Sequence, residues 1–300
     1  PAARMPLQEP GGWRNENEWP IARREDLPLF LGDASLDDLA AEESRCDALP
    51  YRAGTGISSG IHWGGGVLPW GMPLDQRLDN ANSLVYTSAP LEEEIEVTGT
   101  PVARLFVSST ASVAYFRVKL IDVAPDGTAK LVRYGGLNAT HRNSHAEPTP
   151  LVPGQVTRLD LPLKTLAYTF YRGHRLRVSI AGADFQNAWP VADAGVHTIY
   201  RGGDHASRIT LPVIPRQSPA LSLPNLRQLP PADPHQLKKP REYSITKDLG
   251  ESTTTVRLHV ESGDADNRLE LKSSFLVNDR SPADAVLVAE GHYRVCRAEY

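Results

Sequence analysis

The chain of 300 residues has only two cysteines, Cys46 and Cys296, and no run of about 18 apolar residues. The shortage of cysteine excludes a disulfide-dense scaffold and leaves no metal-ligand spacing. The missing apolar run excludes a membrane-spanning helix. Two distant thiols fit a reducing compartment and so favour the cytoplasm, with one disulfide between them as the alternative, but no targeting signal fixes a location.

A large charge of either sign is also missing, since the formal net charge is −4 and the sequence pI is about 6.2. This balance predicts no nucleic-acid partner and no anionic membrane surface as partner. Hydrophobic residues make up 40% and charged residues 23%, which is typical of a globular protein. The first residue is Pro1 and no initiator methionine precedes it, so we expect a piece of a longer polypeptide.

Proline (25) and glycine (23) are abundant and lie between short apolar-alternating segments. From Leu84 onward the hydrophobic period is two, which predicts strands separated by turns. In the segment 114–123, Phe116, Val118, Leu120 and Asp122 are expected to face the core, and Tyr115, Arg117, Lys119 and Ile121 the other side. The expected strands are 84–87, 94–97, 102–108, 114–123, 130–134, 156–161, 166–170, 175–180, 196–200 and 208–211, then 243–247, 253–260, 268–277, 285–289 and 293–296.

This pattern predicts an all-β fold, a jelly-roll β-sandwich (galactose-binding-like) with a smaller antiparallel β unit at the C-terminus. Residues 1–35 are expected to form an arm with one short strand near 29–31, and 36–215 the sandwich. Ser35 followed by acidic residues up to Glu43 predicts one or two helical turns. A proline-rich linker at 216–240 precedes the partial unit at 241–300.

Gly56-Ile57-Ser58-Ser59-Gly60 matches the Gly-x-Ser-x-Gly pattern of a nucleophile elbow. That chemistry needs the serine on a sharp turn between a buried strand and a helix. The residues before it are not an apolar strand, and the glycines after it cannot begin a helix. Ser58 is therefore interpreted as a loop serine, and no catalytic residue is assigned in this chain.

The spacing of the histidines and carboxylates along the sequence does not predict a metal site or a catalytic site. His141 and His145 are four residues apart, but the prolines that follow predict a loop rather than a metal-binding helix. His174 is interpreted as a hydrogen-bonded turn histidine. The carboxylates Asp184, Asp193 and Asp204 are scattered over loops, so we expect neither a metal nor a cofactor.

One group of residues is expected to fix loops to the sandwich, and a second group could contact a partner domain or a ligand. Asp75-Gln76-Arg77 and Asp122 are interpreted as parts of a buried ion-pair network that fixes loops to the sandwich. The tryptophans have two open interpretations: local core beneath long loops, or a surface that contacts another domain or a ligand pocket. The tryptophans concerned are Trp63, Trp70 and Trp189.

A series of motifs resembles the C-terminal domain of the cocaine esterase and X-Pro dipeptidyl-peptidase family. The resemblance covers about residues 10–215, and 241–300 resemble the extra β region of longer members less closely. The motifs, in order, are Gly12-Trp13-Arg14, Glu18-Trp19-Pro20, Asp75-Gln76-Arg77, 83–91, Val97-Thr98-Gly99, 118–123, Pro125-Asp126-Gly127, Gly136-Leu137-Asn138, His141-Arg142, Pro153-Gly154, 173–177 and Leu211-Pro212-Val213.

The resemblance implies a non-catalytic part of a serine hydrolase that cleaves esters or amides, including X-Pro bonds. It implies an α/β-hydrolase domain of the same polypeptide as partner, with a small ester or peptide substrate bound through that domain. By position, the segment 54–63 would approach the active site, with Gly56, Ile57, His62 and Trp63 facing the pocket. Trp13, Trp19 and Trp189 would contact the catalytic domain.

Two other functions stay open. Jelly rolls also occur as stand-alone carbohydrate- or ligand-binding modules, although these usually expose aromatic platforms. A purely structural domain that supports a homo-oligomer is the third alternative.

Overall fold

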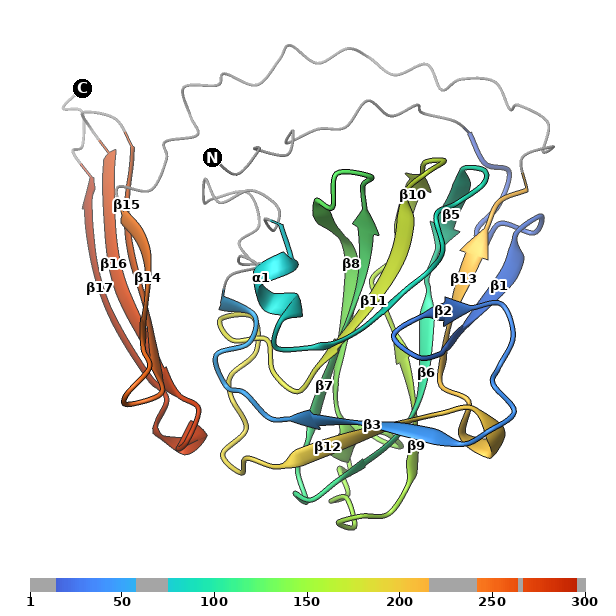
Figure 1. Cartoon of the computed structure of the whole chain (residues 1–300). Coiled ribbons are helices and arrows are strands. Elements are labelled where there is room, and N and C mark those ends of the chain that lie inside the picture. Colours follow the sequence, from blue (N-terminus) through green and yellow to red (C-terminus); the bar gives the residue numbers. More distant parts are fainter. Residues whose placement is uncertain (1–14, 58–74, 216–241, 264–266, 296–300) are drawn as a thin grey trace.

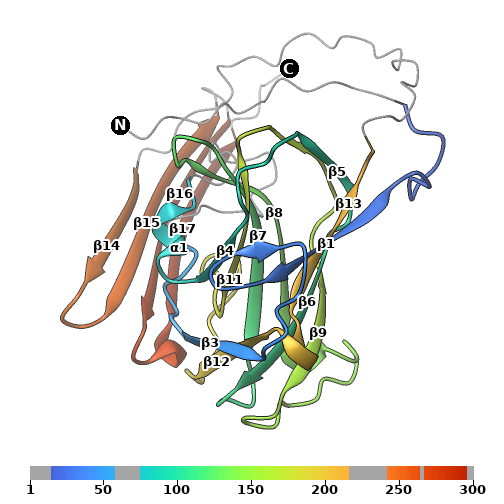
Figure 2. The same cartoon turned by 45° about the vertical axis from the view of Figure 1, so that its right-hand side comes forward.

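The computed structural model describes residues 15–57, 75–215, 242–263 and 267–295. Three antiparallel sheets make up this part of the chain (Figure 1). The predicted all-β sandwich is confirmed, because a nine-stranded and a four-stranded sheet enclose one apolar core. The predicted C-terminal unit is a separate four-stranded sheet (Figure 2).

The nine-stranded sheet has the path β10-β5-β13-β6-β12-β3, with β1 beside β13, β2 beside β1, and β9 beside β6. Its strands are β1 (Glu25–Leu31), β2 (Leu36–Asp37), β3 (Arg45–Pro50), β5 (Ile95–Gly99), β6 (Val102–Ser109), β9 (Thr157–Pro162), β10 (Leu166–Phe170), β12 (Val196–Arg201) and β13 (Arg208–Val213).

The opposing four-stranded sheet has the order β4-β11-β7-β8, and the C-terminal sheet the order β14-β15-β16-β17. The strands of the first are β4 (Leu84–Thr87), β7 (Tyr115–Val123), β8 (Ala129–Asn138) and β11 (Arg175–Ala181). Those of the second are β14 (Glu242–Asp248), β15 (Thr253–Gly263), β16 (Asn267–Asn278) and β17 (Val286–Val295).

Helices are few and short in the described residues. The α-helix α1 (Arg77–Asn80) follows Asp75-Gln76, and three 3₁₀ turns, η2 (Ala139–His141), η3 (Gly203–His205) and η5 (Pro282–Asp284), lie between strands. None of these helices is long and apolar enough to cross a membrane.

The sandwich core follows the predicted alternation. On β6, Ala103 and Leu105 point inward and are 1% exposed, while Arg104 between them faces outward and is half-buried. On β11, Val178 and Ile180 meet this layer from the other sheet. Period-two alternation therefore decides which face of each strand is buried.

Strand β7 departs from the predicted pattern, because both of its faces are buried. The expected core residues Phe116, Val118 and Leu120 are at most 1% exposed. The opposite face, which carries Arg117 and Lys119, is also covered. Another layer of structure must therefore lie over the outer side of this sheet.

The predicted helical turns at 35–43 are wrong. Leu36 is buried and pairs with Leu31 as part of β2, so this segment joins the nine-stranded sheet. A helix of one or two turns gains little by itself and is readily replaced by strand pairing with an apolar anchor. The strand β3 was not predicted, and the two strands expected at 285–289 and 293–296 are one strand, β17.

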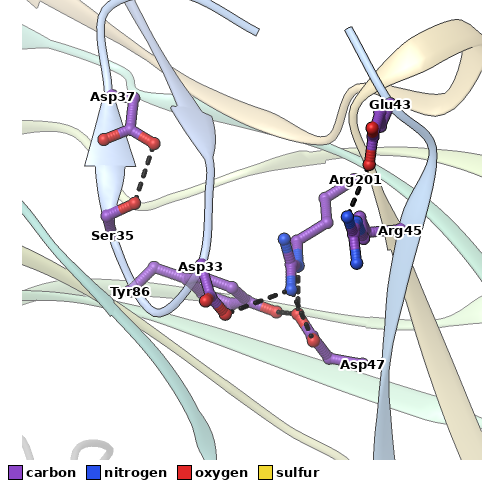
Figure 3. Close-up of polar contacts among 8 residues, drawn as sticks. All are labelled: Asp33, Ser35, Asp37, Glu43, Arg45, Asp47, Tyr86 and Arg201. Atoms are coloured by element: carbon purple, nitrogen blue, oxygen red, sulfur yellow. Dashed lines mark hydrogen bonds and ion pairs between the residues drawn. The ribbon is translucent and has the colours of Figure 1, made fainter. Parts of the chain in front are cut away.

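A polar cluster fastens the N-terminal strands to the sandwich (Figure 3). Arg201 on β12 donates from Nε to Asp47 Oδ2 (2.8 Å) and from an Nη to Asp47 Oδ1 (3.2 Å), and it also lies 3.3 Å from Asp33. Tyr86 on β4 donates its hydroxyl to Asp47 at 2.8 Å. The cluster therefore joins both sheets and the β1–β2 turn.

Candidate functional site

The segment 51–57 begins the loop that was predicted to face a pocket. It is irregular rather than a strand, as the interpretation of Ser58 as a loop serine requires, and Ser58 itself lies outside the described residues. Ile57 is fully buried, and Gly56 has φ of +103°. The predicted pocket residues His62 and Trp63 also lie outside the described residues.

A buried ion-pair network lies on the outer face of β7. Arg117 contacts Asp184 at 2.6 Å, and Lys119 lies 3.3 Å from the other carboxylate oxygen of Asp184. Asp184 is 0% exposed, and the two cations are 6% and 4% exposed. Two cations and one carboxylate thus meet without water, where charges are retained only if they are paired.

Gln76 also belongs to this network and links it to strand β8. Lys119 donates to Gln76 Oε1 at 3.3 Å, and Gln76 is fully buried. The backbone of Gln76 donates to Ala129 of β8 at 2.8 Å. We call Asp184, Arg117, Lys119 and Gln76 the Asp184 network.

The described residues on either side of positions 58–74 contact this network or residues next to it. On one side, the amide of Gly56 donates to Asp79 Oδ1 at 3.3 Å, and Phe185, next to Asp184, donates its amide to Thr55 O at 2.7 Å. On the other side, Gln76 carries the contact to Lys119. The network therefore sets where residues 57 and 75 lie relative to the sheet.

Gly56 is required by sterics as well as by its backbone angle. A Cβ at this position would lie 2.6 Å from a carboxylate oxygen of Asp184 and 2.7 Å from its backbone. A positive φ of this size is also unfavourable for a residue with a side chain. Glycine here permits the close approach of the loop to Asp184.

The C-terminal sheet packs on the same segment. Val256 and Val277, both 0% exposed, form one apolar cluster with Tyr51, Ile57 and Phe185. A hydrogen bond of 3.0 Å from the Gly54 amide to Asp279 Oδ1 also joins the segment to this sheet.

Burial changes the acidity of Tyr51 in this cluster. Desolvation raises the pKa of the Tyr51 hydroxyl to about 12, although the amide of Val191 donates to its oxygen at 3.0 Å. The phenol is therefore neutral at physiological pH, and the segment 51–57 is held by apolar packing and hydrogen bonds rather than by charge.

Histidine contacts in the described residues do not build a nucleophile triad. His197 Nδ1 lies 3.1 Å from Ser109 Oγ, but both residues are buried at 2% exposure or less, and burial lowers the pKa of His197 to about 4. His174 Nδ1 contacts Asp122 at 2.8 Å, which confirms the hydrogen-bonded turn histidine. The carboxylate contact and the serine contact are thus made by two different histidines, His174 and His197.

The residues Asp75-Gln76-Arg77 and Asp122, predicted to form one network, belong to three separate clusters. Gln76 belongs to the Asp184 network, whereas Asp75 pairs with Arg77 at the surface. Asp122 accepts hydrogen bonds from Tyr168 and contacts His174 on another part of the sheet.

One donor set in the described residues could hold a metal ion. His259, Glu261 and Glu270 on β15 and β16 offer ligand atoms that all lie within 4.8 Å of one another. Glu270 already contacts His259 at 3.0 Å and Lys272 at 2.9 Å, and these hydrogen bonds, led by that from Lys272, lower the pKa of Glu270. Glu270 is thus already hydrogen-bonded to two neighbouring side chains.

Two of the predicted docking tryptophans are described, and both are exposed. Trp19 is 58% and Trp189 is 56% exposed. Trp189 lies beside Phe185, with ring centroids 5.9 Å apart, at the edge of the apolar cluster. Trp13 lies outside the described residues.

Sequence reasoning missed Asp184, Arg117 and Lys119 as one unit. A signal was present, because Arg117 and Lys119 occupy the same face of a strand whose other face begins with the apolar residues Phe116, Val118 and Leu120. Two cations on a buried strand imply a carboxylate partner, but spacing could not choose Asp184 among the loop carboxylates.

The family model for the X-Pro dipeptidyl-peptidase C-terminal non-catalytic domain matches residues 1–218. A Mycobacterium bovis protein that carries the name of a serine esterase is 34% identical over 226 residues, which cover 67% of this chain and 36% of that protein. The cocaine esterase of a Rhodococcus species is 29% identical over 238 residues, which cover 68% of this chain and 40% of that enzyme.

Among solved structures, an aminopeptidase from a marine sediment Thaumarchaeota archaeon shares the fold, with a TM-score of 0.62 and 24% identity. The match covers 68% of this chain and 39% of the aminopeptidase. The chain thus spans well under half the length of the curated relatives it matches. From its sandwich architecture and the match over residues 1–218, this chain belongs to the family of X-Pro dipeptidyl-peptidase C-terminal non-catalytic domains, as found in cocaine esterase-like hydrolases.

Proposed function

We propose that this domain packs on an α/β-hydrolase domain of the same polypeptide and helps to shape the substrate pocket of a serine hydrolase. The substrate class would be esters or amides, including X-Pro peptide bonds. The observation that carries the proposal is the family match to a non-catalytic domain over residues 1–218. The serine esterase and cocaine esterase names of the relatives support a hydrolase of this kind.

The Asp184 network supports the pocket-shaping part of the proposal. Positioning a pocket-lining loop requires rigid attachment at both ends, because small displacements near a reacting group are costly. Here Phe185, the residue after Asp184, donates its amide to Thr55 on one side, and Gln76 accepts a hydrogen bond from Lys119 on the other.

The exposed Trp189 supports the docking part of the proposal. An exposed tryptophan at the edge of an apolar cluster is a typical anchor of a domain interface. Trp19 is a second exposed candidate near the N-terminal end of the described residues. The family's catalytic serine, histidine and aspartate would then lie on the partner domain, where an acyl-enzyme would form.

The catalytic part of the proposal is tested with nitrophenyl esters. The 300-residue chain alone should release no burst of nitrophenol, while the longer polypeptide that includes the hydrolase domain should. A burst from the isolated chain that is lost in Ser58→Ala would refute the non-catalytic role.

The docking part is tested by hydrogen–deuterium exchange on the longer polypeptide. Amides around 183–191 should exchange more slowly there than in the isolated chain. Trp189→Ala should remove this protection, whereas Tyr171→Ala, at an exposed turn after β10, should leave it unchanged. Equal exchange in the two polypeptides would contradict docking through this surface.

A further inference from the structure

The outer face of the nine-stranded sheet carries a groove of about 270 Å³ between β1, β6 and β13. Three arginines line it: Arg24, Arg104 and Arg208. Strand alternation places Arg104 and Arg208 there, because their neighbours Ala103 and Ile209 point into the core at 1% exposure. These two arginines are therefore held by rigid strands with their guanidinium groups on the solvent side, and Arg24 lies directly before β1.

Arg104 and Arg208 are direct cross-strand partners on β6 and β13. Like charges that face each other across a sheet repel, and this pairing is unfavourable unless a counter-charge lies between them. Arg104 has such a partner in Asp160 at 2.6 Å, but Asp160 is shared with Arg158 at 3.3 Å.

Arg208 has no carboxylate partner in the part of the chain that the structure describes. Its recorded neighbour is the ring of Phe30, whose centroid lies 5.7 Å from the guanidinium carbon. Phe30 pairs with Arg208 across β1 and β13, so the ring supports one side of the guanidinium group and leaves its other donors for a ligand.

The charge around the groove is unbalanced. Four guanidinium groups, those of Arg24, Arg104, Arg158 and Arg208, face the carboxylates of Asp26 and Asp160, which leaves an excess of two positive charges. Asp26 lies 4.0 Å from Arg24 and is well exposed, so it neutralises the groove only weakly.

We propose that this groove binds a small anionic ligand, with a carboxylate or phosphate group held between Arg104 and Arg208. Guanidinium groups match the planar oxygens of both anions and can donate two parallel hydrogen bonds. The groove is slightly smaller than the pockets that usually enclose drug-sized molecules. Its ligand would thus be of the size of a di- or tricarboxylic acid or a phosphate monoester.

The groove is separate from the Asp184 network and from the C-terminal sheet. Strands β1 and β13 lie on the opposite side of the molecule from β14–β17 in both views (Figures 1 and 2). A ligand here would not compete with the segment 51–57, so its binding can be measured independently of any hydrolase activity.

The test is isothermal titration calorimetry of the 300-residue chain at low ionic strength, with citrate and inorganic phosphate titrated separately. At least one anion should bind with a Kd of about 1 mM or lower, a modest affinity. Binding of citrate alone would assign a carboxylate ligand, and binding of phosphate alone a phosphate ligand. Arg208→Gln should weaken binding at least tenfold, and Arg24→Gln severalfold.

The matched control is Arg45→Gln, which removes the same charge from an exposed arginine that pairs with Glu43 outside the groove (Figure 3). It should change the affinity by less than twofold. If Arg208→Gln perturbs folding, as seen by circular dichroism, Arg24→Gln before β1 replaces it. The proposal is overturned if neither anion binds, or if Arg45→Gln weakens binding as much as the groove variants.

Discussion

Removing the charge of Asp184 should destabilise the domain strongly. In Asp184→Asn the shape of the side chain is kept, but the buried cations Arg117 and Lys119 lose the charge of the carboxylate that they contact. Two unit charges about 4 Å apart interact by about 4 kcal/mol at an effective dielectric constant of about 20. Breaking buried pairs typically costs about 3–5 kcal/mol, so we expect a loss in this range.

Urea denaturation followed by tryptophan fluorescence measures this loss. With a slope of about 2 kcal/mol per molar urea, 4 kcal/mol moves the unfolding midpoint by about 2 M. The control is Glu43→Gln, which breaks an exposed pair with Arg45 and should cost at most about 1 kcal/mol. A midpoint for Asp184→Asn within the range of that control would show that the Asp184 network contributes nothing to stability.

A triple replacement distinguishes charge from packing in the same site. Asp184→Leu with Arg117→Met and Lys119→Met removes all three charges and keeps apolar volume. If desolvated charge is the cause, this variant should be more stable than Asp184→Asn, because the two cations that lost the charge of Asp184 are removed as well. A triple variant that is less stable than Asp184→Asn would contradict that cause.

Three further predictions concern single residues. Gly56→Ala should destabilise the fold more than Gly127→Ala. Both glycines have a positive φ, but only at Gly56 would an added Cβ meet other atoms within 3 Å. The melting temperature of Gly56→Ala should therefore be the lower of the two. Tyr86→Phe removes a hydrogen bond to the Asp47 carboxylate and should lower the free energy of unfolding, measured by urea denaturation, by about 1.5–3 kcal/mol. An unchanged free energy of unfolding would show that this hydrogen bond does not stabilise the fold. Because burial lowers the pKa of His197 to about 4 from 6.5, the folded state resists protonation that the unfolded chain accepts. Its contribution to stability is complete above pH 6.5 and is lost as the pH falls toward 4, by about 2 kcal/mol between pH 7.5 and pH 5, and His197→Gln should remove that part of the pH dependence.

The strands were predictable because one physical pattern controls them. The segment 102–108 alternates between buried and half-buried residues over most of its length and matches β6. The structure of short segments was decided by tertiary contacts instead. Residues 35–43 have the composition of a helix start, but one buried side chain, Leu36, and a neighbouring strand decided the outcome.

The candidate site was only partly predictable. The sequence indicated that the residues around Gln76 are buried and polar, but it paired them with Asp122 instead of Asp184. Which carboxylate meets Arg117 depends on how the loop after β11 folds back over the sheet, and no local periodicity encodes that path. The packing of the C-terminal sheet on the segment 51–57 could not be predicted for the same reason. It depends on contacts between residues more than 200 positions apart in the sequence, such as that between Gly54 and Asp279.

The cover that Val256 and Val277 provide has a practical consequence for trimming this protein. A shorter version ending at residue 218, where the family match stops, would expose the apolar side chains of Tyr51, Ile57 and Phe185 to water. Such a newly exposed surface favours self-association. The C-terminal sheet therefore covers a surface that would otherwise favour self-association, and removing this sheet should increase the tendency of the remaining chain to aggregate.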